Sequence, residues 1–255
     1  MADRKLKIDI RRDRILELLR QSGRVYVSEL SRLLEATPVT IRNDLDALER
    51  DGYLTRVQGG ALLRARPVSQ PDRDAPARLA EKQAIAQAVL AQIPDGSTLF
   101  LNSGTTTQIL AAAMADRKNL NVVTNSLAAA LELGKLPMVH VLLLGGELNA
   151  QFGFTYGSDA QAQLLQYQAD WAILSVDGVS TSGITSFHAE ETAIDRMMID
   201  RAKQVIIAAD YTKIGRAGFT HICSAESPIQ LVTDQKCDPN ALRQLELLGV
   251  QVTLA

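Results

Sequence analysis

Apolar residues recur at helical spacing near the start of the chain, which predicts short helices there. Ile15, Leu18 and Leu19 follow an i, i+3, i+4 pattern, and Gly23 is placed to end that helix. A second helix is predicted after it, with Ser28 as its N-terminal cap. The residues that this second helix is expected to bury are Leu30, Leu33 and Leu34.

A third helix and a hairpin complete this N-terminal region. Thr37 followed by Pro38 is a strong start signal, because a hydroxyl can cap a helix whose first residue is proline. This helix is predicted to run to about Arg50, and its inner stripe consists of Ile41, Leu45 and Leu48. The stretch YLTRVQGGALL then predicts two short strands around its glycine pair. Three short helices and a hairpin are typical of a winged helix-turn-helix.

The rest of the chain alternates between helical and strand patterns. The stretch RARPVSQPDRDAPAR is rich in proline, so we expect a linker at 64–77 between an N-terminal domain at 1–63 and a C-terminal domain at 78–255. Helices are expected at about 78–92, 106–115, 126–133, 158–166, 188–202 and 239–247. Strands are expected at STLFLN, LNVVTN, VHVLLLGG, DWAILSV, QVIIAAD, IQLVTD and VQVTLA.

These strands are mostly continuous apolar runs, which indicates a sheet covered on both faces. Strand and helix in alternation favour a mainly parallel sheet. The predicted fold class is therefore α/β, with a small N-terminal winged helix-turn-helix domain followed by a larger, mainly parallel, Rossmann-like α/β domain.

Composition excludes several classes of protein. Of the 255 residues, 46% are hydrophobic and 22% are charged, as in an ordinary globular protein. Cys223 and Cys237 form no CxxC pair and the three histidines are far apart, so we expect neither a disulfide framework nor a metal site. The charged start is unlike a signal peptide, and no apolar run is long enough to span a bilayer. We therefore expect a cytoplasmic protein with no membrane contact.

Charge is distributed unevenly along the chain. Residues 1–66 carry 14 Lys and Arg against 10 Asp and Glu, whereas the remainder carries 13 against 19. A basic N-terminal domain on an acidic body suggests contact with a polyanion at one end. Solvated helix faces are the simpler alternative.

The third helix has an outer face suited to DNA. Val39, Asn43, Asp46 and Arg50 lie opposite its apolar stripe. The side chains that we expect to contact DNA from this helix and the hairpin are Thr37, Thr40, Arg42, Asn43 and Arg56. Arginine can bind guanine, asparagine can bind adenine, and threonine can bind phosphate or a thymine methyl group. The alternative is an ordinary three-helix cap with a solvated face.

A family resemblance favours the DNA-binding helix over the ordinary three-helix cap. The stretch TPVTIRNDLDALERDGYLTRVQGGA closely resembles the DNA-binding domain of DeoR-type bacterial transcription regulators, whose pattern has a TIRRDL core and an HGGA-like wing. Asn43 replaces the usual second arginine, and Gln58 replaces the usual histidine. The resemblance implies double-stranded operator DNA as a partner, and the amide of Asn43 would then tune which operator is bound.

A second candidate site is the loop in LNSGTTTQIL, which follows one predicted strand and precedes a helix. Open α/β sheets bind ligands outside the carboxyl ends of their strands, and the amides at a helix start attract anions. The loop residues that we expect to bind a phosphate are Ser103, Gly104, Thr105, Thr106 and Thr107. It is not a nucleotide P-loop, because GxxxxGK[ST] is missing. A capped turn with no ligand is the alternative.

Polar residues at other strand ends add to this candidate site. If the sheet is parallel, these ends meet at one edge. The residues that we expect to bind a phosphorylated polyol there are Asn125, Ser126, Asp177, Gly178 and Lys213. Lys213 would neutralise the phosphate, while Asp177 and Asn125 would bind hydroxyl groups. A strand-end turn or cap is the alternative for each.

The same segment resembles the effector domain of DeoR-type regulators. The matching motifs are SGTTT, VVTNS, LLGGEL, SVDGVS with GIT, EETAIDRMMI and AADYTKIG. The resemblance implies a phosphorylated-sugar effector, bound by a domain similar in fold to ribose-5-phosphate isomerase. It places Glu191 near the position of that enzyme's base, whereas a solvated charge at a helix start is the alternative.

These patterns favour a transcriptional repressor of a sugar-metabolism operon, with no catalytic residue and no cofactor. Because one short recognition helix gives limited specificity, we expect a homo-oligomer, dimer or tetramer, on paired half-sites. The competing hypotheses are a sugar-phosphate isomerase or aldolase with an appended domain, and a sugar-binding module without a DNA role. The segment SVDGVS lacks the second carboxylate of the isomerase-like DGADE pattern, with Ser180 near that point.

Overall fold

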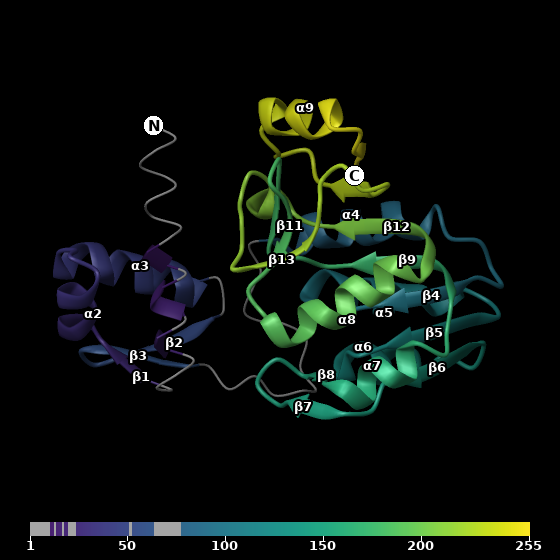
Figure 1. Ribbon diagram of the computed structural model, residues 1–255, viewed down its shortest axis with the longest axis horizontal. Coiled ribbons are helices and arrows are strands. Elements are labelled where there is room, and N and C mark those ends of the chain that lie inside the picture. Colours follow the sequence, from purple (N-terminus) through teal and green to yellow (C-terminus); the bar gives the residue numbers. More distant parts are fainter. Residues whose placement is uncertain (1–10, 13, 17, 20–23, 51–52, 64–77) are drawn as a thin grey trace. The chain divides into compact units, whose positions relative to one another are not determined.

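The computed structural model describes residues 11–12, 14–16, 18–19, 24–50, 53–63 and 78–255. The chain divides into two compact units, Met1–Ala65 and Arg66–Ala255, which are described separately (Figure 1). The expected helix stop at Gly23 and the expected linker at 64–77 lie outside the described residues.

The N-terminal unit packs helices against a small sheet. Its described residues between 11 and 19 are helical, and they are followed by α2 (Val27–Leu33) and α3 (Pro38–Arg50). The strands β1 (Arg24–Tyr26), β2 (Leu54–Val57) and β3 (Gly60–Leu63) form an antiparallel sheet in the order β1-β3-β2. The core of this unit includes Ile15, Leu19, Leu30, Ile41, Leu45 and Leu54. The third helix and the hairpin are therefore confirmed.

Two expectations about α2 are wrong. The helix begins at Val27, with Tyr26 at the N-cap and no side-chain cap bond, so Ser28 lies inside the helix. Leu33 is 59% exposed, because the buried stripe of this short helix runs through Val27 and Leu30 instead.

The backbone of the hairpin requires glycine at two positions. Gly59 has a φ of +79° in the turn, where a residue without a β-carbon is least strained. Gly60 pairs with Tyr26 across β1 and β3, and a β-carbon there would lie 2.0 Å from the carbonyl oxygen of Val25. Only glycine lets β1 approach β3 this closely.

The C-terminal unit is built on a seven-stranded sheet in the order β15-β14-β12-β9-β4-β5-β6. Every neighbouring pair is parallel. The strands are β4 (Thr98–Leu101), β5 (Leu120–Thr124), β6 (Val139–Leu143), β9 (Ala169–Leu174), β12 (Ala202–Ala208), β14 (Gln230–Thr233) and β15 (Gln251–Leu254). The order reverses between β4 and β9, and such a switch point is where open α/β sheets bind ligands.

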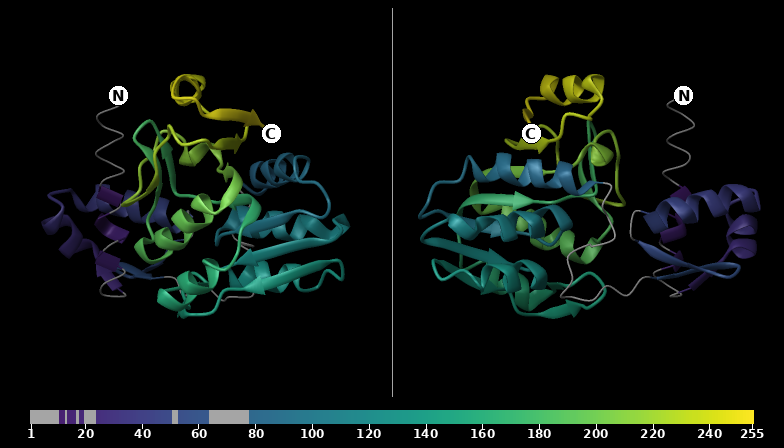
Figure 2. Two further views of the ribbon diagram at one scale, coloured as in Figure 1. Left: turned by 45° about the vertical axis from the view of Figure 1, so that its right-hand side comes forward. Right: turned by 180° about the vertical axis from the view of Figure 1, so that it is seen from behind.

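Helices cover both faces of this sheet. One core packs β-strands against α4 (Leu79–Leu90), α5 (Thr105–Ala113) and α6 (Leu127–Leu133), and the other packs them against α7 (Ser158–Leu164), α8 (Ala189–Asp200) and α9 (Pro239–Leu247). Helix α8 is in front in Figure 1, and α4 comes to the front in the right-hand view of Figure 2. Neighbours Leu99 and Phe100 enter opposite cores, which explains why the strands read as continuous apolar runs.

The predicted α/β class and all seven strands of the large sheet are confirmed. The sequence patterns missed several strands of three or four residues that lie in the smaller sheets. These are β1 in the N-terminal unit, the hairpin β7 (Glu147–Asn149) and β8 (Phe154–Tyr156), and the antiparallel sheet of β10 (Gly178–Ser180), β11 (Gly183–Ser186) and β13 (Thr220–Cys223).

The close approach at Gly60 can be tested by substitution. We expect Gly60→Ala to destabilise the N-terminal unit by about 1–3 kcal/mol, because the added methyl group forces β1 away from β3. Hydrogen exchange measured by mass spectrometry should then speed up within 24–63 and stay unchanged in the seven-stranded sheet. Gly59→Asn is the control, since nothing lies within 4 Å of its added β-carbon and asparagine tolerates a positive φ. Equal exchange in both variants would contradict this account.

Candidate functional site

The buried side chain of Asn102 joins the two strands at the switch point. Its Oδ1 accepts a hydrogen bond from the N–H of Ser175 at 2.8 Å, and its Nδ2 donates to the carbonyl oxygen of Ser175 at 3.0 Å. The same Nδ2 donates to Oδ1 of Asp195 on α8 at 2.9 Å. Asn102 thus continues the pairing of β4 with β9 beyond the strands and fixes the loops that follow them.

The loop after β4 leads directly into α5. Gly104 is the N-cap residue, and no side chain caps the helix. A β-carbon on Gly104 would lie 2.5 Å from Cβ of Ser175, so glycine is needed for the loops to pack. The hydroxyl of Thr107 donates to the carbonyl oxygen of Asn102 at 2.9 Å and holds the loop from inside. The first-turn amides of α5 have no intrahelical acceptor, which is the property that binds anions.

A buried lysine lies at this helix start. Lys82, on α4, is 7% exposed, and its Nζ donates to the hydroxyl of Thr105 at 2.7 Å. Sequence reasoning missed this residue, although a signal was present. Lys82 shares an i, i+3, i+4 stripe with Ile85 and Ala86, so a lysine stands where the helix pattern calls for an apolar residue. A buried lysine needs an anionic or polar partner, which makes it a functional candidate.

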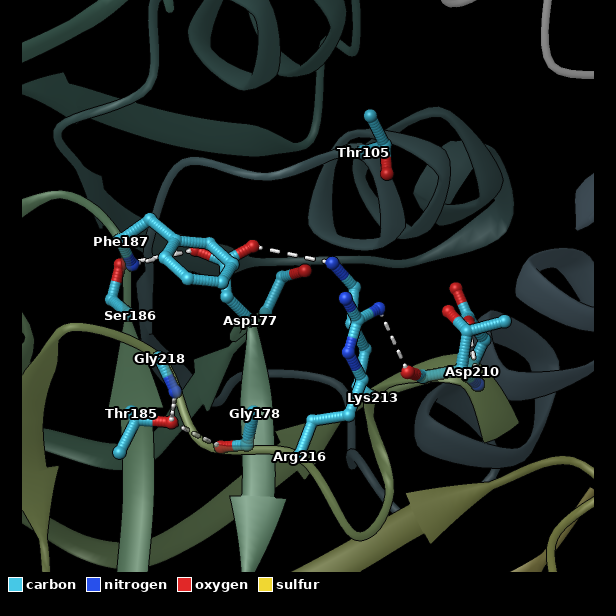
Figure 3. A network of polar contacts seen from close by, with 12 residues as sticks. Thr105, Asp177, Gly178, Thr185, Ser186, Phe187, Asp210, Lys213, Arg216 and Gly218 are labelled. Atoms are coloured by element: carbon cyan, nitrogen blue, oxygen red, sulfur yellow. Dashed lines mark hydrogen bonds and ion pairs between the residues drawn. The ribbon is translucent and has the colours of Figure 1, made fainter. Parts of the chain in front are cut away.

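Further cations belong to the same region. Lys213 lies in the short helix η3 (Tyr211–Lys213), and its Nζ is 3.2 Å from Oδ1 of Asp177. Arg216 donates from Nη1 to the carbonyl oxygen of Thr212 at 3.2 Å. Figure 3 draws both side chains in one network of polar contacts with Thr105 and Asp177. Lys213 and Arg216 thus lie in the same network as the carboxylates of Asp177 and Asp210.

Asp177 is held as a carboxylate within this network. Its Oδ2 accepts hydrogen bonds from the N–H of Phe187 at 3.0 Å and from the hydroxyl of Ser186 at 3.3 Å (Figure 3). Burial opposes its ionisation, but Lys213, His188 and the N–H of Phe187 outweigh it and lower the pKa of Asp177 to about 2.

Gly178, next to Asp177, is required by the close packing around it. A β-carbon there would lie 2.5 Å from the hydroxyl of Thr185 and 2.6 Å from the carbonyl oxygen of Arg216. Ser126 likewise has a structural task, because its hydroxyl accepts the N–H of Ala129 at 3.2 Å and caps α6. Whether either residue also contacts a ligand stays a prediction.

Glu191 is buried in the loop cluster rather than solvated. It is 4% exposed, and its Oε1 accepts hydrogen bonds from the N–H of Ser103 at 3.1 Å and from Nδ2 of Asn125 at 3.2 Å. Burial and the nearby carboxylate of Asp195 raise the pKa of Glu191 well above its ordinary value. Burial likewise raises the pKa of Asp195 to about 7. Burial on this side of the site therefore favours the protonated, neutral forms of both carboxyl groups.

Asn125 carries an acceptor that the described residues do not satisfy. Its Nδ2 donates to the carbonyl oxygen of Thr155 at 3.3 Å, which fixes the orientation of the amide because a carbonyl can only accept. Its Oδ1 is buried and has no hydrogen-bond partner within the described part of the chain. A buried acceptor of this kind suits a ligand hydroxyl group.

The geometry therefore brings together residues predicted at several strand ends. Ser103 and Asn125 meet at Glu191, Thr105 meets Lys82, and Asp177 meets Lys213. Within the described residues, no group of three His, Cys, Asp or Glu side chains could hold a metal ion. Nor does any described helix have the length and apolar character needed to cross a membrane.

The N-terminal unit presents a separate surface on α3. Ile41, Leu45 and Leu48 are buried, whereas Arg42 and Asn43 are exposed on the opposite side. The hydroxyl of Thr37 accepts the N–H of Thr40 at 3.2 Å, so the predicted helix cap is present.

Arg56 fastens the wing to this helix. Its Nε lies 2.9 Å from Oδ1 of Asp46, its backbone N–H donates to Glu49 at 2.6 Å, and its Nη1 donates to the carbonyl oxygen of Gly60 at 2.7 Å. The ion pair neutralises the carboxylate of Asp46 beside the proposed DNA-binding face, and the three bonds together hold the wing next to α3.

Comparison with known proteins finds a family match for each unit. Residues 11–66 match the DeoR-like helix-turn-helix domain, and residues 77–235 match the DeoR C terminal sensor domain. The chain is 34% identical over 246 residues to the glycerol-3-phosphate regulon repressor of Escherichia coli (strain K12), covering 96% of this chain and 98% of that protein. It is also 34% identical over 242 residues to the HTH-type transcriptional repressor GlcR of Bacillus subtilis (strain 168), covering 93% of each.

Among solved structures, ribose 5-phosphate isomerase A from Methanocaldococcus jannaschii matches 54% of this chain and 55% of its own, with a TM-score of 0.40 and 14% identity.

The raised pKa of Asp195 predicts a pH-dependent stability. Because the folded state binds a proton that the unfolded state releases above about pH 4, the contribution of Asp195 to stability should fall as pH rises from about 4 to about 7 and then level out. Asp195→Asn removes this dependence, so the variant should gain on the wild type over that window, by at most about 4 kcal/mol for a shift of about three units.

Urea unfolding can be followed by the fluorescence of Trp171, the single tryptophan, which lies in β9. The matched control is Asp200→Asn, at the exposed end of α8, which should follow the wild type. If the free energy of unfolding depends on pH in the same way for the wild type and for Asp195→Asn, the raised pKa of Asp195 is contradicted.

Proposed function

The chain belongs to the DeoR family of transcriptional regulators, and from this premise we propose that it represses a sugar-metabolism operon in response to a phosphorylated sugar. The DNA-binding unit supplies operator recognition through α3 and its wing. The seven-stranded unit binds the effector at the switch point between β4 and β9. The cytoplasm is the compartment in which both partners occur.

The observation that carries the effector proposal is the buried ammonium of Lys82 at the start of α5. Its Nζ bonds to Thr105, next to the uncapped first turn of that helix. A phosphate group at this position would accept hydrogen bonds from the first-turn amides of α5, at Thr106 and Thr107, and would be neutralised by Lys82 and Lys213.

The opposite side of the site suits the hydroxyl groups of a sugar. The unpartnered Oδ1 of Asn125 accepts a hydrogen bond, and a protonated Glu191 can donate one. A cationic side and a neutral acidic side together fit a small molecule with a phosphate at one end and hydroxyl groups at the other. In this proposal Ser103 and Gly104 shape the loop, and Asp177 orients Lys213.

Helix α4 connects the effector site to the DNA-binding unit along the chain. It is the first described helix after that unit, and it carries Lys82. Arg78, at its N-cap, lies 3.9 Å from Asp210 at the end of β12. If a phosphate bound beside Lys82 and α5 shifts α4, operator affinity changes when the protein binds DNA with different affinity in its two forms.

Operator binding is assigned to the exposed side of α3. Arg42 and Asn43 would contact base edges or phosphates, and Thr37 and Thr40 form the helix start that faces a phosphate. Arg56 would act on the wing, beside the backbone of the DNA. A homo-oligomer, dimer or tetramer, assembled through the C-terminal unit, would place two such helices on paired half-sites.

An isomerase is the less favoured function. The relatives named above are repressors, and Ser180 lies where the isomerase-like pattern has its second carboxylate. The carboxylate of Asp177 is also already paired with Lys213. Turnover of pentose or hexose phosphates above background would favour the enzyme instead.

Lys82→Met tests the effector site. A phosphosugar panel screened by thermal shift should find a ligand that stabilises the wild type by about 2.7 kcal/mol at 100 times its Kd. Methionine keeps the apolar stem of Lys82 but removes the charged hydrogen bond, so the ligand should bind at least about tenfold more weakly. The control is Lys203→Met, which loses an exposed lysine paired with Asp170 and should keep the full shift. Equal shifts in all three proteins would place the site elsewhere.

Gel shifts test the regulator itself. The chain should bind DNA from its own upstream region at least about a thousandfold more tightly than random DNA at physiological salt. Arg42→Ala should weaken that binding, whereas Lys203→Met should leave it unchanged. If no operator-length DNA binds more tightly than random DNA, the proposed function fails.

A further inference from the structure

Val39 is an apolar residue that the core of the N-terminal unit does not use. It is the second residue of α3 and is 61% exposed, while the other large apolar residues of this helix are buried. Val39 and Asn43 are four residues apart, so their side chains lie on the same side of the helix. Both are exposed there.

The polar groups around Val39 are occupied within the unit. The hydroxyl groups of Thr37 and Thr40 are 2.9 Å apart, and Thr37 also caps the helix. Asp46, one turn beyond Asn43, is paired with Arg56. Besides the cationic Arg42, the first turns of α3 therefore present an aliphatic group and an amide. They lie at the N-terminal end of the helix, the part of a recognition helix that contacts base edges.

The major groove offers one apolar group, the 5-methyl group of thymine, and adenine is the base that pairs with an asparagine amide. We infer that Val39 packs on a thymine methyl group of the operator while Asn43 binds an adenine, so that this pair of residues selects A·T base pairs. This inference rests on the proposed DNA-binding function. The inference adds Val39 to the DNA-binding function as a residue that determines specificity, and it assigns adenine to Asn43.

The helix geometry limits where the two bases can lie. Four residues of helix rise by about 6 Å, and successive base pairs are about 3.4 Å apart. The thymine and the adenine therefore lie within about two base pairs of each other in each half-site.

Deoxyuridine substitution tests this inference, because it removes only the methyl group. The full-length chain is first used to select its operator from a random DNA library, and each thymine of the selected operator is then replaced in turn. At one thymine in each half-site the wild-type affinity should fall about fourfold, the effect of one buried methyl group. Val39→Ala should bind the thymine and deoxyuridine operators equally.

Leu33→Ala is the matched control. Leu33 is an equally exposed aliphatic residue of the same unit, at 59%, but it belongs to α2. This variant should keep the fourfold sensitivity. An operator in which no thymine methyl group matters, or a Val39→Ala protein that keeps the sensitivity, would overturn the inference. A chain that selects no sequence at all would instead contradict the proposed function.

Discussion

The effector unit depends on the hydrogen bonds of Asn102. Its buried side-chain amide holds the end of β4 to the end of β9 and also binds Asp195 on α8. The main-chain carbonyl oxygen of Asn102 accepts a hydrogen bond from the hydroxyl of Thr107 on α5. Where the strand order reverses, the main-chain pairing of the two strands reaches the N–H of Asn102, which lies 3.4 Å from the carbonyl oxygen of Ile173, and the loops follow directly. Asn102 connects these loops, so the start of α5 and the buried acids of α8 keep one geometry.

The site combines two opposite electrostatic environments within one set of loops. On one side, Lys82 and Lys213 lie near an uncapped helix start, and Asp177 stays ionised beside them. On the other, burial favours the protonated forms of Glu191 and Asp195. Two such environments in one set of loops suit the proposed ligand, which has an anionic group and neutral hydroxyl groups.

The fold and the region of the site could be predicted from the sequence, because both follow from local patterns. Apolar runs identified all seven strands of the large sheet, and polar residues at their ends indicated the edge that carries the candidate site. The residues missed, Asn102 and Lys82, act through partners far along the chain, at Ser175 and Thr105 respectively. Leu33 was wrongly predicted to be buried, because residue spacing alone does not show how wide the buried stripe of a short helix is.

Reciprocal binding measurements test most directly whether the site at α5 regulates DNA binding. The operator affinity is measured with and without saturating effector, and the effector affinity with and without saturating operator. Because coupling is reciprocal, both ratios should equal the same factor, about 5–150-fold. A factor of one in both directions would show that the ligand site does not act on DNA binding.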